Sequence, residues 1–407
     1  MVGTGVRQEL TTADAALRAL STHRAQVVAG CIPFDTHAPT ALFEPNRWET
    51  FDRGWLEHRG EQALAALDST SLSAPNRSGL PGEIQYRELP GPDEHLRRVH
   101  DAVSKIRAAA SVTVASDSEA ADTPAPEAMS AEPIALEKVV LARALEMHLP
   151  SPVQPMSLLD RMVAQDHHGR GFLSALSAAG ERFTGTHMVG SSPEILIERR
   201  GNQIFTHPLA GTMRREPDDR QADRNAALSL QNSFKDLDEH RFVVEAIEQT
   251  LRPLCSDLDV PPLPTLTHTP HVWHLGTPIT GTLKSPTTTA LELALALHPT
   301  PAVAGTPQAQ AIEHIQQVEA DRGFYAGAVG WSDASGDGHW RVLLRAAHIS
   351  DDGSTVIAQA GGGIVADSIA EDELLETYLK LSPVVSALGG QQWLKAHVDA
   401  VAAVGRR

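Results

Sequence analysis

The sequence predicts an α+β fold: a single domain in which helices flank a large antiparallel β-sheet sandwich. Two turn signals indicate antiparallel pairing, because strand-like segments meet across Gly201-Asn202 and again across Asp351-Asp352-Gly353. Such hairpins outnumber strand–helix–strand units, which disfavours a parallel sheet. The chain has 407 residues, 42% of them hydrophobic, and can therefore bury a core of the size that this fold needs.

The strand signals are strongest in the middle and near the end of the chain. They cover residues 134–145, 194–200, 203–209, 340–350 and 354–360. Helices are expected in the gaps, over 92–110, 235–252, 288–297, 308–319 and 368–380. The last should begin near Ser368, because Glu371 three residues later completes a capping-box pattern.

Four regions follow one another along the chain. Residues 1–110 form an N-terminal part of the fold, residues 134–390 the main core and residues 391–407 a C-terminal tail helix. Between them, residues 114–133 are rich in Ala, Asp, Ser and Pro and lack periodicity. This stretch is therefore expected to be a flexible surface insertion.

The overall composition excludes several classes of protein. A net charge of −17 and a pI near 5.5 argue against nucleic-acid binding, which requires a basic surface. No apolar run approaches the roughly 18 residues of a membrane span. Cys31 and Cys255 lie far apart and form no CxxC motif, which indicates reduced thiols in a cytoplasmic protein.

Lys138 breaks the pattern of the first strand segment. It shares one face with Leu136 and Val140 at a period of two, so it points into an apolar surface. A buried amine without a partner loses its proton more readily and could serve as a general base near neutral pH. The alternatives are an edge strand with the lysine reaching water, or an ion pair with Glu137 or Arg143.

The helix over 235–252 carries polar residues on its apolar stripe. Extending this stripe backwards from Val243 leads to His240, Glu239 and Asp236. A carboxylate at a core position is costly unless it is paired or bound to a cation, and oxygen ligands suit Mg²⁺ better than Zn²⁺. The alternative is a first turn that emerges from the core into water.

The helix over 368–380 has a dense acidic side. Glu373, Glu376 and Lys380 share the face opposite its leucines. Taken alone, this pattern is typical of a solvated face with a Glu376–Lys380 pair one turn apart. A binding site on this face would need support from elsewhere in the sequence.

Three consecutive glycines, Gly361, Gly362 and Gly363, are expected between a strand and this last helix. Their N–H groups could converge on an anion near a helix N-terminus, and the alternative is a turn without a ligand. The stretch also fits the dinucleotide fingerprint G-x-G-x-x-A. No parallel strand with an acidic end follows, so a nicotinamide oxidoreductase is not expected.

Ten motifs in fixed order resemble the chorismate-utilising enzymes, which include anthranilate, aminodeoxychorismate, isochorismate and salicylate synthases. The resemblance spans roughly residues 134–385, with a weaker match at GCIPFD (30–35), and makes 134–390 the chorismate-binding catalytic core. The motifs are KVVLAR (138–143), GSSPEILIER (190–199), HPLAGT (207–212), KDLDEH (235–240), HLGTPITGTL (274–283), HPTPAVAGTP (298–307), DRGFYAGAVGW (321–331), RVLLRAAHI (341–349), AGGGIV (360–365) and ETYLKL (376–381).

Within this family the sequence is most similar to the isochorismate synthases, which form isochorismate from chorismate. The block at 298–307 is typical of that branch, and Ala210 stands where aminodeoxychorismate synthases carry lysine. One departure is Gly362, where many relatives have alanine. The alternatives are a salicylate synthase, which goes on to eliminate pyruvate, and a non-catalytic homologue that binds chorismate. The resemblance leaves open whether the product feeds a siderophore or a quinone such as menaquinone.

The resemblance also implies roles for individual residues. Lys138 would take a proton from the attacking water, and Glu194 would protonate the departing hydroxyl. Mg²⁺ would be bound by Glu239 and Glu376, with support from Asp236 and Glu373. The substrate-binding residues would be Gly211, Thr212, His274, Thr277, Tyr325, Arg345, Gly362, Gly363 and Lys380. The family further implies a monomer without an amidotransferase subunit, because water is the nucleophile.

Overall fold

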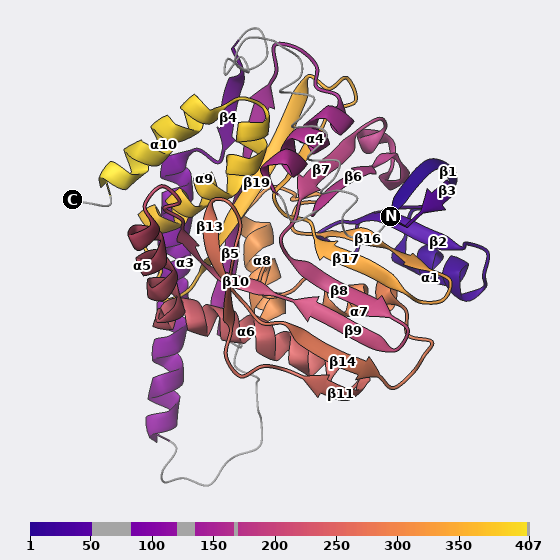
Figure 1. Ribbon diagram of the computed structural model, residues 1–407. Helices are drawn as coiled ribbons and strands as arrows, with labels where there is room; N and C mark the ends of the chain where they lie inside the picture. The colour runs from indigo at the N-terminus through magenta and orange to yellow at the C-terminus, as the bar shows by residue number, and fades with distance from the viewer. Residues whose placement is uncertain (51–82, 120–134, 167–169, 405–407) are drawn as a thin grey trace.

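The protein is described by a computed structural model that covers residues 1–50, 83–119, 135–166 and 170–404. Two large sheets and one small sheet are surrounded by helices (Figure 1). The strand pairings within the described ranges are antiparallel. The predicted α+β class with antiparallel sheet is therefore confirmed.

The first large sheet has nine strands and includes the N-terminal segment. In spatial order they are β1 (Val2–Leu10), β3 (Ala41–Glu49), β2 (Val27–Ile32), β16 (Ala328–Asp333), β17 (Gly338–Val342), β8 (Ile195–Arg200), β9 (Gln203–His207), β14 (Ile279–Leu283) and β11 (Cys255–Asp259). The hairpin predicted across Gly201-Asn202 is the β8–β9 pair.

The second large sheet is built around β5 and β19, and a small sheet lies beside it. The larger one runs β15 (Gly305–Thr306), β5 (Lys138–His148), β19 (Thr355–Ile364), β18 (Ala346–Ile349), β7 (His187–Ser191) and β6 (Gly171–Ala175), with β4 (Gln85–Leu89) also paired to β5. The small sheet is β10 (Leu209–Arg214), β13 (Val272–Gly276) and β12 (Thr265–His268). The hairpin predicted at Asp351-Asp352-Gly353 is the β18–β19 pair.

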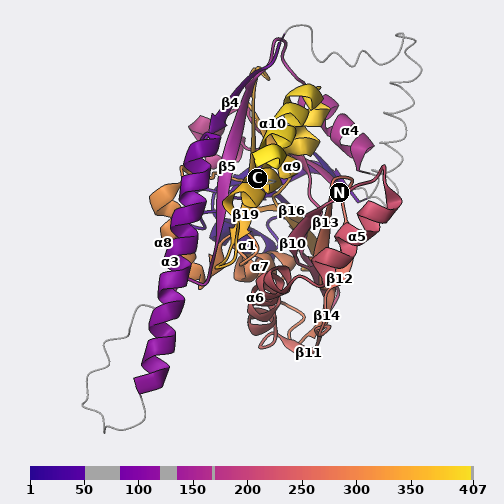
Figure 2. The same cartoon turned by 90° about the vertical axis from the view of Figure 1, so that its left-hand side faces the viewer.

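Helices cover the outer faces of these sheets. They are α1 (Ala13–Ser21), α3 (Pro92–Glu119), α4 (Pro155–Gln165), α5 (Arg220–Gln231), α6 (Phe234–Leu251), α7 (Ala290–Leu297), α8 (Gln308–Val318), α9 (Ala370–Ala387) and α10 (Gln391–Val404). Helix α9 packs on β19, α6 packs on β10, and α3 runs along β5 and α9 (Figure 2). Among the described residues, no helix combines the length and apolar character that crossing a bilayer requires.

Two helix predictions need correction. Helix α3 continues to Glu119, into the stretch 114–133 that was expected to be a flexible insertion, and the remainder of that stretch, 120–133, lies outside the described residues. Helix α9 begins at Ala370 without a side-chain cap. The hydroxyl of Ser368 instead donates to the Glu373 carboxylate at 2.7 Å, so the side chain that should cap the helix holds a site residue. The other three internal helices agree with prediction to within two residues.

The single strand predicted over 340–350 is wrong. The chain leaves β17 in one large sheet and enters β18 in the other, with Leu343, Leu344 and Arg345 between them. Arg345 has a φ of 52°, a left-handed conformation that breaks an extended strand. A run of apolar residues cannot reveal such a switch between sheets, and the switch is what places Arg345 between them.

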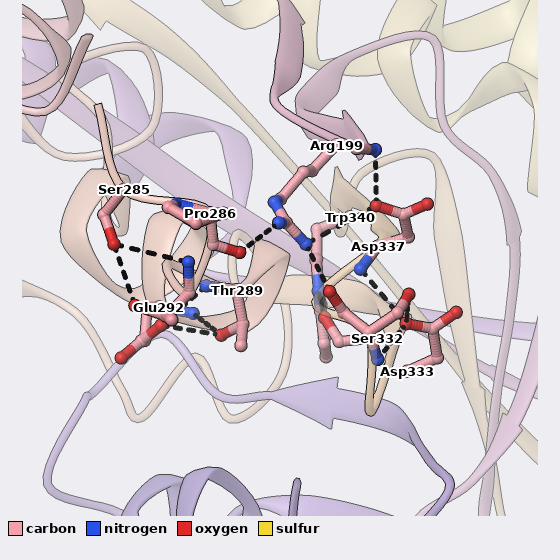
Figure 3. Close-up of polar contacts among 12 residues, drawn as sticks. Arg199, Ser285, Pro286, Thr289, Glu292, Ser332, Asp333, Asp337 and Trp340 are labelled. Atoms are coloured by element: carbon pink, nitrogen blue, oxygen red, sulfur yellow. Dashed lines mark hydrogen bonds and ion pairs between the residues drawn. The ribbon is translucent and has the colours of Figure 1, made fainter. Parts of the chain in front are cut away.

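The strand that follows Glu194 is anchored at its far end by a buried arginine (Figure 3). Arg199 donates to the carbonyl oxygens of Ser335 (3.0 Å) and Pro286 (2.7 Å) and reaches the Asp337 carboxylate at 3.4 Å. These bonds tie β8 to the β16–β17 turn and to the loop before α7. Helix α7 itself starts with a capping box between Thr289 and Glu292.

One large hydrophobic core joins the N-terminal region to the rest of the chain. It contains Leu20 from α1, Val103 from α3, Val139 from β5, Val243 from α6 and Trp340 from β17. Segments far apart in sequence therefore share one interior, which keeps the strands around the site in fixed positions.

Candidate active site

A cavity lies where β5, β19 and β10 approach one another, beneath α6 and α9. Nine of the residues expected at the site line it: Glu194, Gly211, Thr212, Glu239, His274, Tyr325, Arg345, Gly363 and Lys380. The rest of its wall is mostly apolar: Val140, Pro193, Leu209, Ala210, Ala302, Val303, Leu344, Gln359, Ala360 and Gly361. Such a cavity, apolar with a few converging charges, is typical of a site for a small molecule.

Glu194 is held immediately before β8 and is 3% exposed. Its amide donates to the Ser192 hydroxyl at 3.3 Å, and that hydroxyl donates to Val342 O at 2.6 Å, which fixes the backbone at this point. Burial raises the pKa of Glu194 to about 7, although Lys138 and Arg345 act in the opposite direction. The carboxyl can therefore carry a proton near neutral pH and give it up.

Lys138 is the first residue of β5 and is fully buried, as the strand pattern predicted. Its ammonium nitrogen lies 3.1 Å from Glu239 Oε1, so the expectation of an unpaired amine is wrong. The partner also differs from Glu137 and Arg143, the two residues that the sequence offered nearby. A contact between residues 101 positions apart is invisible to local sequence patterns.

Four carboxylates from α6 and α9 gather near the glycines of the site: Glu373 and Glu376 lie near Gly362, Glu239 near Gly363 and Asp236 near Gly211. Burial raises the pKa of Glu373 to about 7, and the neighbouring Glu376 adds to the rise. Burial also raises the pKa of Asp236, and both Glu239 and Glu376 contribute. The acidic face of α9 is therefore not a solvated surface, and the carboxylates of this cluster repel one another.

Lysines partly neutralise this acidic cluster. Lys235 lies 2.7 Å from Glu373, and Lys380 pairs with Glu376 while donating to Gly361 O at 2.8 Å. Burial alone would raise the pKa of Glu239, but Lys138, Lys235 and Lys380 together lower it. The charges of these three lysines therefore favour the anionic form of Glu239.

The three glycines lie inside β19, not in a loop before the helix as expected. A Cβ at Gly362 would come within 2.6 Å of Glu373 Oε2, and one at Gly363 would overlap Glu239 Oε1. Only residues without side chains allow the carboxylates of α6 and α9 to approach the strand so closely. The glycines are thus explained by the acidic cluster and not by a turn.

Only alternate glycines of β19 present their backbone to the cavity. Gly361 O accepts from Lys380 and Gly363 O accepts from Ser368 at 3.5 Å, so both residues face away from β5. In an antiparallel ladder the residue between them, Gly362, bonds to the neighbouring strand. Gly362 is therefore not placed to donate to a ligand, contrary to expectation, whereas Gly361 is.

Arg345, His274 and Gly211 form a chain of hydrogen bonds along one wall. Arg345 Nη2 donates to His274 Nε2 at 3.4 Å, and Nδ1 of the same ring lies 3.3 Å from Gly211 O and 3.2 Å from the Thr212 hydroxyl. Because a guanidinium can only donate, Nε2 must be the acceptor and Nδ1 carries the hydrogen. Burial and the charge of Arg345 hold the pKa of His274 well below its usual range, which agrees with a neutral ring.

Tyr325 and Thr277 have different positions. Tyr325 is 5% exposed and lines the cavity, where burial raises its pKa to about 12. Thr277 is buried but does not line the cavity, since its hydroxyl bonds to His240 Nε2 at 2.7 Å. His240 in turn lies beside Glu239 on α6, so Thr277 supports this helix.

Sequence reasoning missed several residues of the site. Lys235 lies in the same motif as Asp236 and was given no role, although its ammonium nitrogen lies 2.7 Å from Glu373 Oε1. Gln359 lines the cavity two residues before Gly361 on the same face of β19, a relation that period two could have revealed. The apolar wall residues Ala302 and Val303 come from a loop and carry no pattern of their own.

The donor set fits a hard divalent cation. Within the ranges that the structure describes, no three of these side chains are arranged as metal ligands. Glu239, Glu373 and Glu376 are instead each paired with a lysine. Carboxylate oxygens are nevertheless the ligands that Mg²⁺ prefers, and the mutual repulsion of the cluster would be relieved by a cation. The space kept free by Gly362 and Gly363 is where Glu373 and Glu239 approach β19.

Known proteins resemble this chain over most of its length. A model of the family described as chorismate binding enzyme matches residues 124–389. MenF of Mycobacterium tuberculosis is 39% identical over 396 residues, covering 96% of this chain and 94% of that protein. The isochorismate synthase EntC of Escherichia coli is 33% identical over 364 residues, covering 89% and 81%.

A solved structure also resembles the whole chain. DhbC from Bacillus anthracis has a TM-score of 0.76 and 31% sequence identity, covering 95% of this chain and 93% of that one. The region matched by the family model, residues 124–389, includes every cavity-lining residue named above. The chain therefore belongs to the chorismate binding enzyme family.

Proposed function

We infer that this protein is an isochorismate synthase, which converts chorismate reversibly to isochorismate. The observation that carries this inference is Glu194: a buried carboxyl whose pKa is raised to about 7, in the same cavity as the buried Arg345. An acid that can donate a proton near neutral pH suits the loss of a hydroxyl group. The isochorismate synthases among the relatives favour this reaction over salicylate formation.

Cationic and hydrogen-bonding groups would hold the two carboxylates of chorismate. Arg345 has donors left after its bond to His274 and would take the enolpyruvyl carboxylate, together with Tyr325. Lys380, Gly361 and Gly363 line the other wall, where the ammonium group and the two backbone N–H groups would add donors for the ring carboxylate. The apolar residues between these walls would contact the ring and exclude bulk water.

The reaction replaces one hydroxyl by another. Lys138 would accept a proton from water as the water oxygen bonds to ring C2. The ring double bonds shift, the C4–O bond breaks, and Glu194 would give its proton to the departing hydroxyl, which leaves as water. One water enters and one leaves, so no oxidant or other co-reactant is needed.

We further propose that Mg²⁺ binds at the acidic cluster. Glu239 and Glu376 would be the direct ligands, with Asp236 and Glu373 in support. When bound, the ion would supply positive charge beside the ring carboxylate of the substrate. Lys138, 3.1 Å from Glu239, would remain the group that accepts the proton from water. We expect a cytoplasmic monomer without an amidotransferase subunit, since water is the nucleophile.

Product analysis tests the proposal. The purified protein is incubated with chorismate and Mg²⁺, with and without EDTA, and the products are separated by chromatography. An equilibrium mixture of chorismate and isochorismate that EDTA prevents is expected. Salicylate with pyruvate would move the protein to the salicylate synthases, and the absence of any product with bound chorismate would indicate a non-catalytic homologue.

A further inference from the structure

One edge of β5 beside the cavity is completed by an ion pair. On this edge β15 pairs with residues 138–139 and β4 pairs with residues 144–148. In the gap between them, Arg322 Nη2 donates to Val140 O at 2.7 Å and the amide of Ala142 donates to Glu319 Oε1 at 2.7 Å. Side chains thus supply the donor and the acceptor that a neighbouring strand would offer.

Glu319 and Arg322 are also bound to each other. Arg322 Nε lies 2.8 Å from Glu319 Oε2 and Nη2 lies 2.9 Å from Oε1, with side chains 2% and 5% exposed for the arginine and the glutamate. Arg322 Nη1 donates in addition to Val303 O at 2.8 Å. The three nitrogens of one guanidinium therefore connect β5, the end of α8 and the loop that carries Val303, which only a planar fork can do.

The groups attached to this pair are walls of the cavity. Val140 and Val303 line it, and Lys138 lies two residues before Val140 on the same face of the strand. The amide of Tyr325 donates to Arg322 O at 3.1 Å, so the tyrosine is fixed by the same residue. Neither Glu319 nor Arg322 lines the cavity itself.

We propose that the Glu319–Arg322 pair is a positioning device for the reaction. It holds the segment of β5 that begins with Lys138 at a fixed distance from the walls that carry Val303 and Tyr325. Misplacement of a reacting group by about 1 Å can cost on the order of 100-fold in rate. The proposal rests on the proposed function, because the step that it serves is the attack of water activated by Lys138.

Arg322→Lys is the decisive variant, since it keeps the charge but cannot donate to Glu319, Val140 and Val303 at once. We expect kcat for chorismate to fall at least ~10-fold while KM changes less than ~3-fold, as for a loss of geometry rather than of binding. Hydrogen–deuterium exchange of the peptide spanning 138–143 should become faster. Arg97→Lys is the matched control, because Arg97 pairs with an acid three residues earlier, Glu94, on an exposed helix face.

Either of two results would overturn the proposal: a kcat within twofold of the wild type, or a loss of kcat without faster exchange in 138–143. If Arg322→Lys does not fold, Glu319→Gln carries both measurements, because it keeps an oxygen for the Ala142 amide and loses the ionic bond to Arg322. We expect at least a threefold fall in kcat there, and an unchanged kcat would overturn the proposal. A wild-type protein that forms no isochorismate would instead refute the proposed function, whatever the exchange measurement shows.

Discussion

Glu194 and Lys138, the acid and the base proposed for the reaction, are both buried but have different surroundings. The carboxyl of Glu194 is desolvated and its pKa rises to about 7, so the proton needed by a leaving hydroxyl is available at neutral pH. Lys138 is equally buried but lies against Glu239. The sequence pattern indicated that Lys138 was buried, while nothing in the sequence near Glu194 distinguished it from a surface charge at the start of a strand.

Glu194→Gln should lower kcat by about 100-fold or more, because the acid is lost. The same change should stabilise the protein at alkaline pH. A carboxyl whose folded pKa is raised contributes most to stability at low pH, and this contribution is lost as pH rises from about 4 to about 7. The difference in free energy of unfolding between variant and wild type should therefore grow by about 2 kcal/mol from pH 5 to pH 8, as measured by urea denaturation.

Glu198→Gln on the same strand is the control for this prediction. His339 and burial act on Glu198 in opposite directions, and the hydrogen bond from His339 prevails, which lowers the pKa of Glu198 to about 2. Its replacement should leave kcat unchanged and should not stabilise the protein as pH rises. A Glu194→Gln enzyme with wild-type kcat would contradict the assignment of the acid.

Lys138→Ala should abolish turnover and leave binding of Mg²⁺ and chorismate largely intact, since the lysine is proposed to act on water. Isothermal titration calorimetry measures binding, and chromatography measures turnover. Lys395→Ala, at an exposed position of α10, serves as the control. An unfolded variant that binds neither ligand would show that Lys138 is needed for structure, as expected if loss of a buried ion-pair partner costs about 3–5 kcal/mol.

At the scale of single elements, periodicity predicted most helices and turn signals predicted both hairpins, because both kinds of pattern depend on neighbours along the chain. These local patterns did not predict the position of Arg345, where one apolar run passes between two sheets. They also did not predict that the three glycines continue β19 instead of following its end. The capping-box pattern also assigned Ser368 to the N-cap of a helix, whereas its hydroxyl donates to Glu373. In each case a contact with a distant element overrides the local signal, and only the order of the family's motifs indicated which residues would meet.

Gly363→Ala should inactivate the enzyme with little loss of secondary structure, because the new methyl group would overlap Glu239 Oε1 and press on the Lys138 side chain. The expected result is at least a ~100-fold fall in kcat/KM and a circular dichroism spectrum like that of the wild type. Gly91→Ala is a matched control, since a Cβ there meets no atom within 4 Å. Full activity in Gly363→Ala would mean that the carboxylates of α6 need not approach β19.

Helices α6 and α9 together form the proposed metal site, so a change in one ligand should alter the demand for metal. Glu376→Gln removes a negative charge and should raise the Mg²⁺ concentration for half-maximal activity at least ~10-fold, measured by titration of initial rates. Asp372→Asn, an exposed acidic residue on the same helix, should leave that concentration unchanged. An unchanged Mg²⁺ requirement in Glu376→Gln would refute the assignment of this ligand.

At the scale of the whole molecule, the family-matched region depends on chain outside it. Strand β16 pairs with β2, β5 pairs with β4, and Val103 of α3 belongs to the same core as Val139. The Phe34 ring lies 4.5 Å from the guanidinium carbon of Arg322. The N-terminal segment therefore shapes the cavity although none of the cavity-lining residues comes from it.

A fragment of residues 135–390 should consequently fail to fold on its own. Without β2 the edge of β16 would be unpaired, and without α3 part of the core would be open to water, so the fragment should aggregate. Size-exclusion chromatography and thermal melting followed by circular dichroism compare it with the full chain, which should be compact and melt cooperatively. If the fragment melted cooperatively and retained isochorismate formation, the N-terminal strands would be dispensable for the site. If the fragment lost both cooperative melting and isochorismate formation, as predicted, the cavity would be shown to require the N-terminal strands as well as the family-matched region.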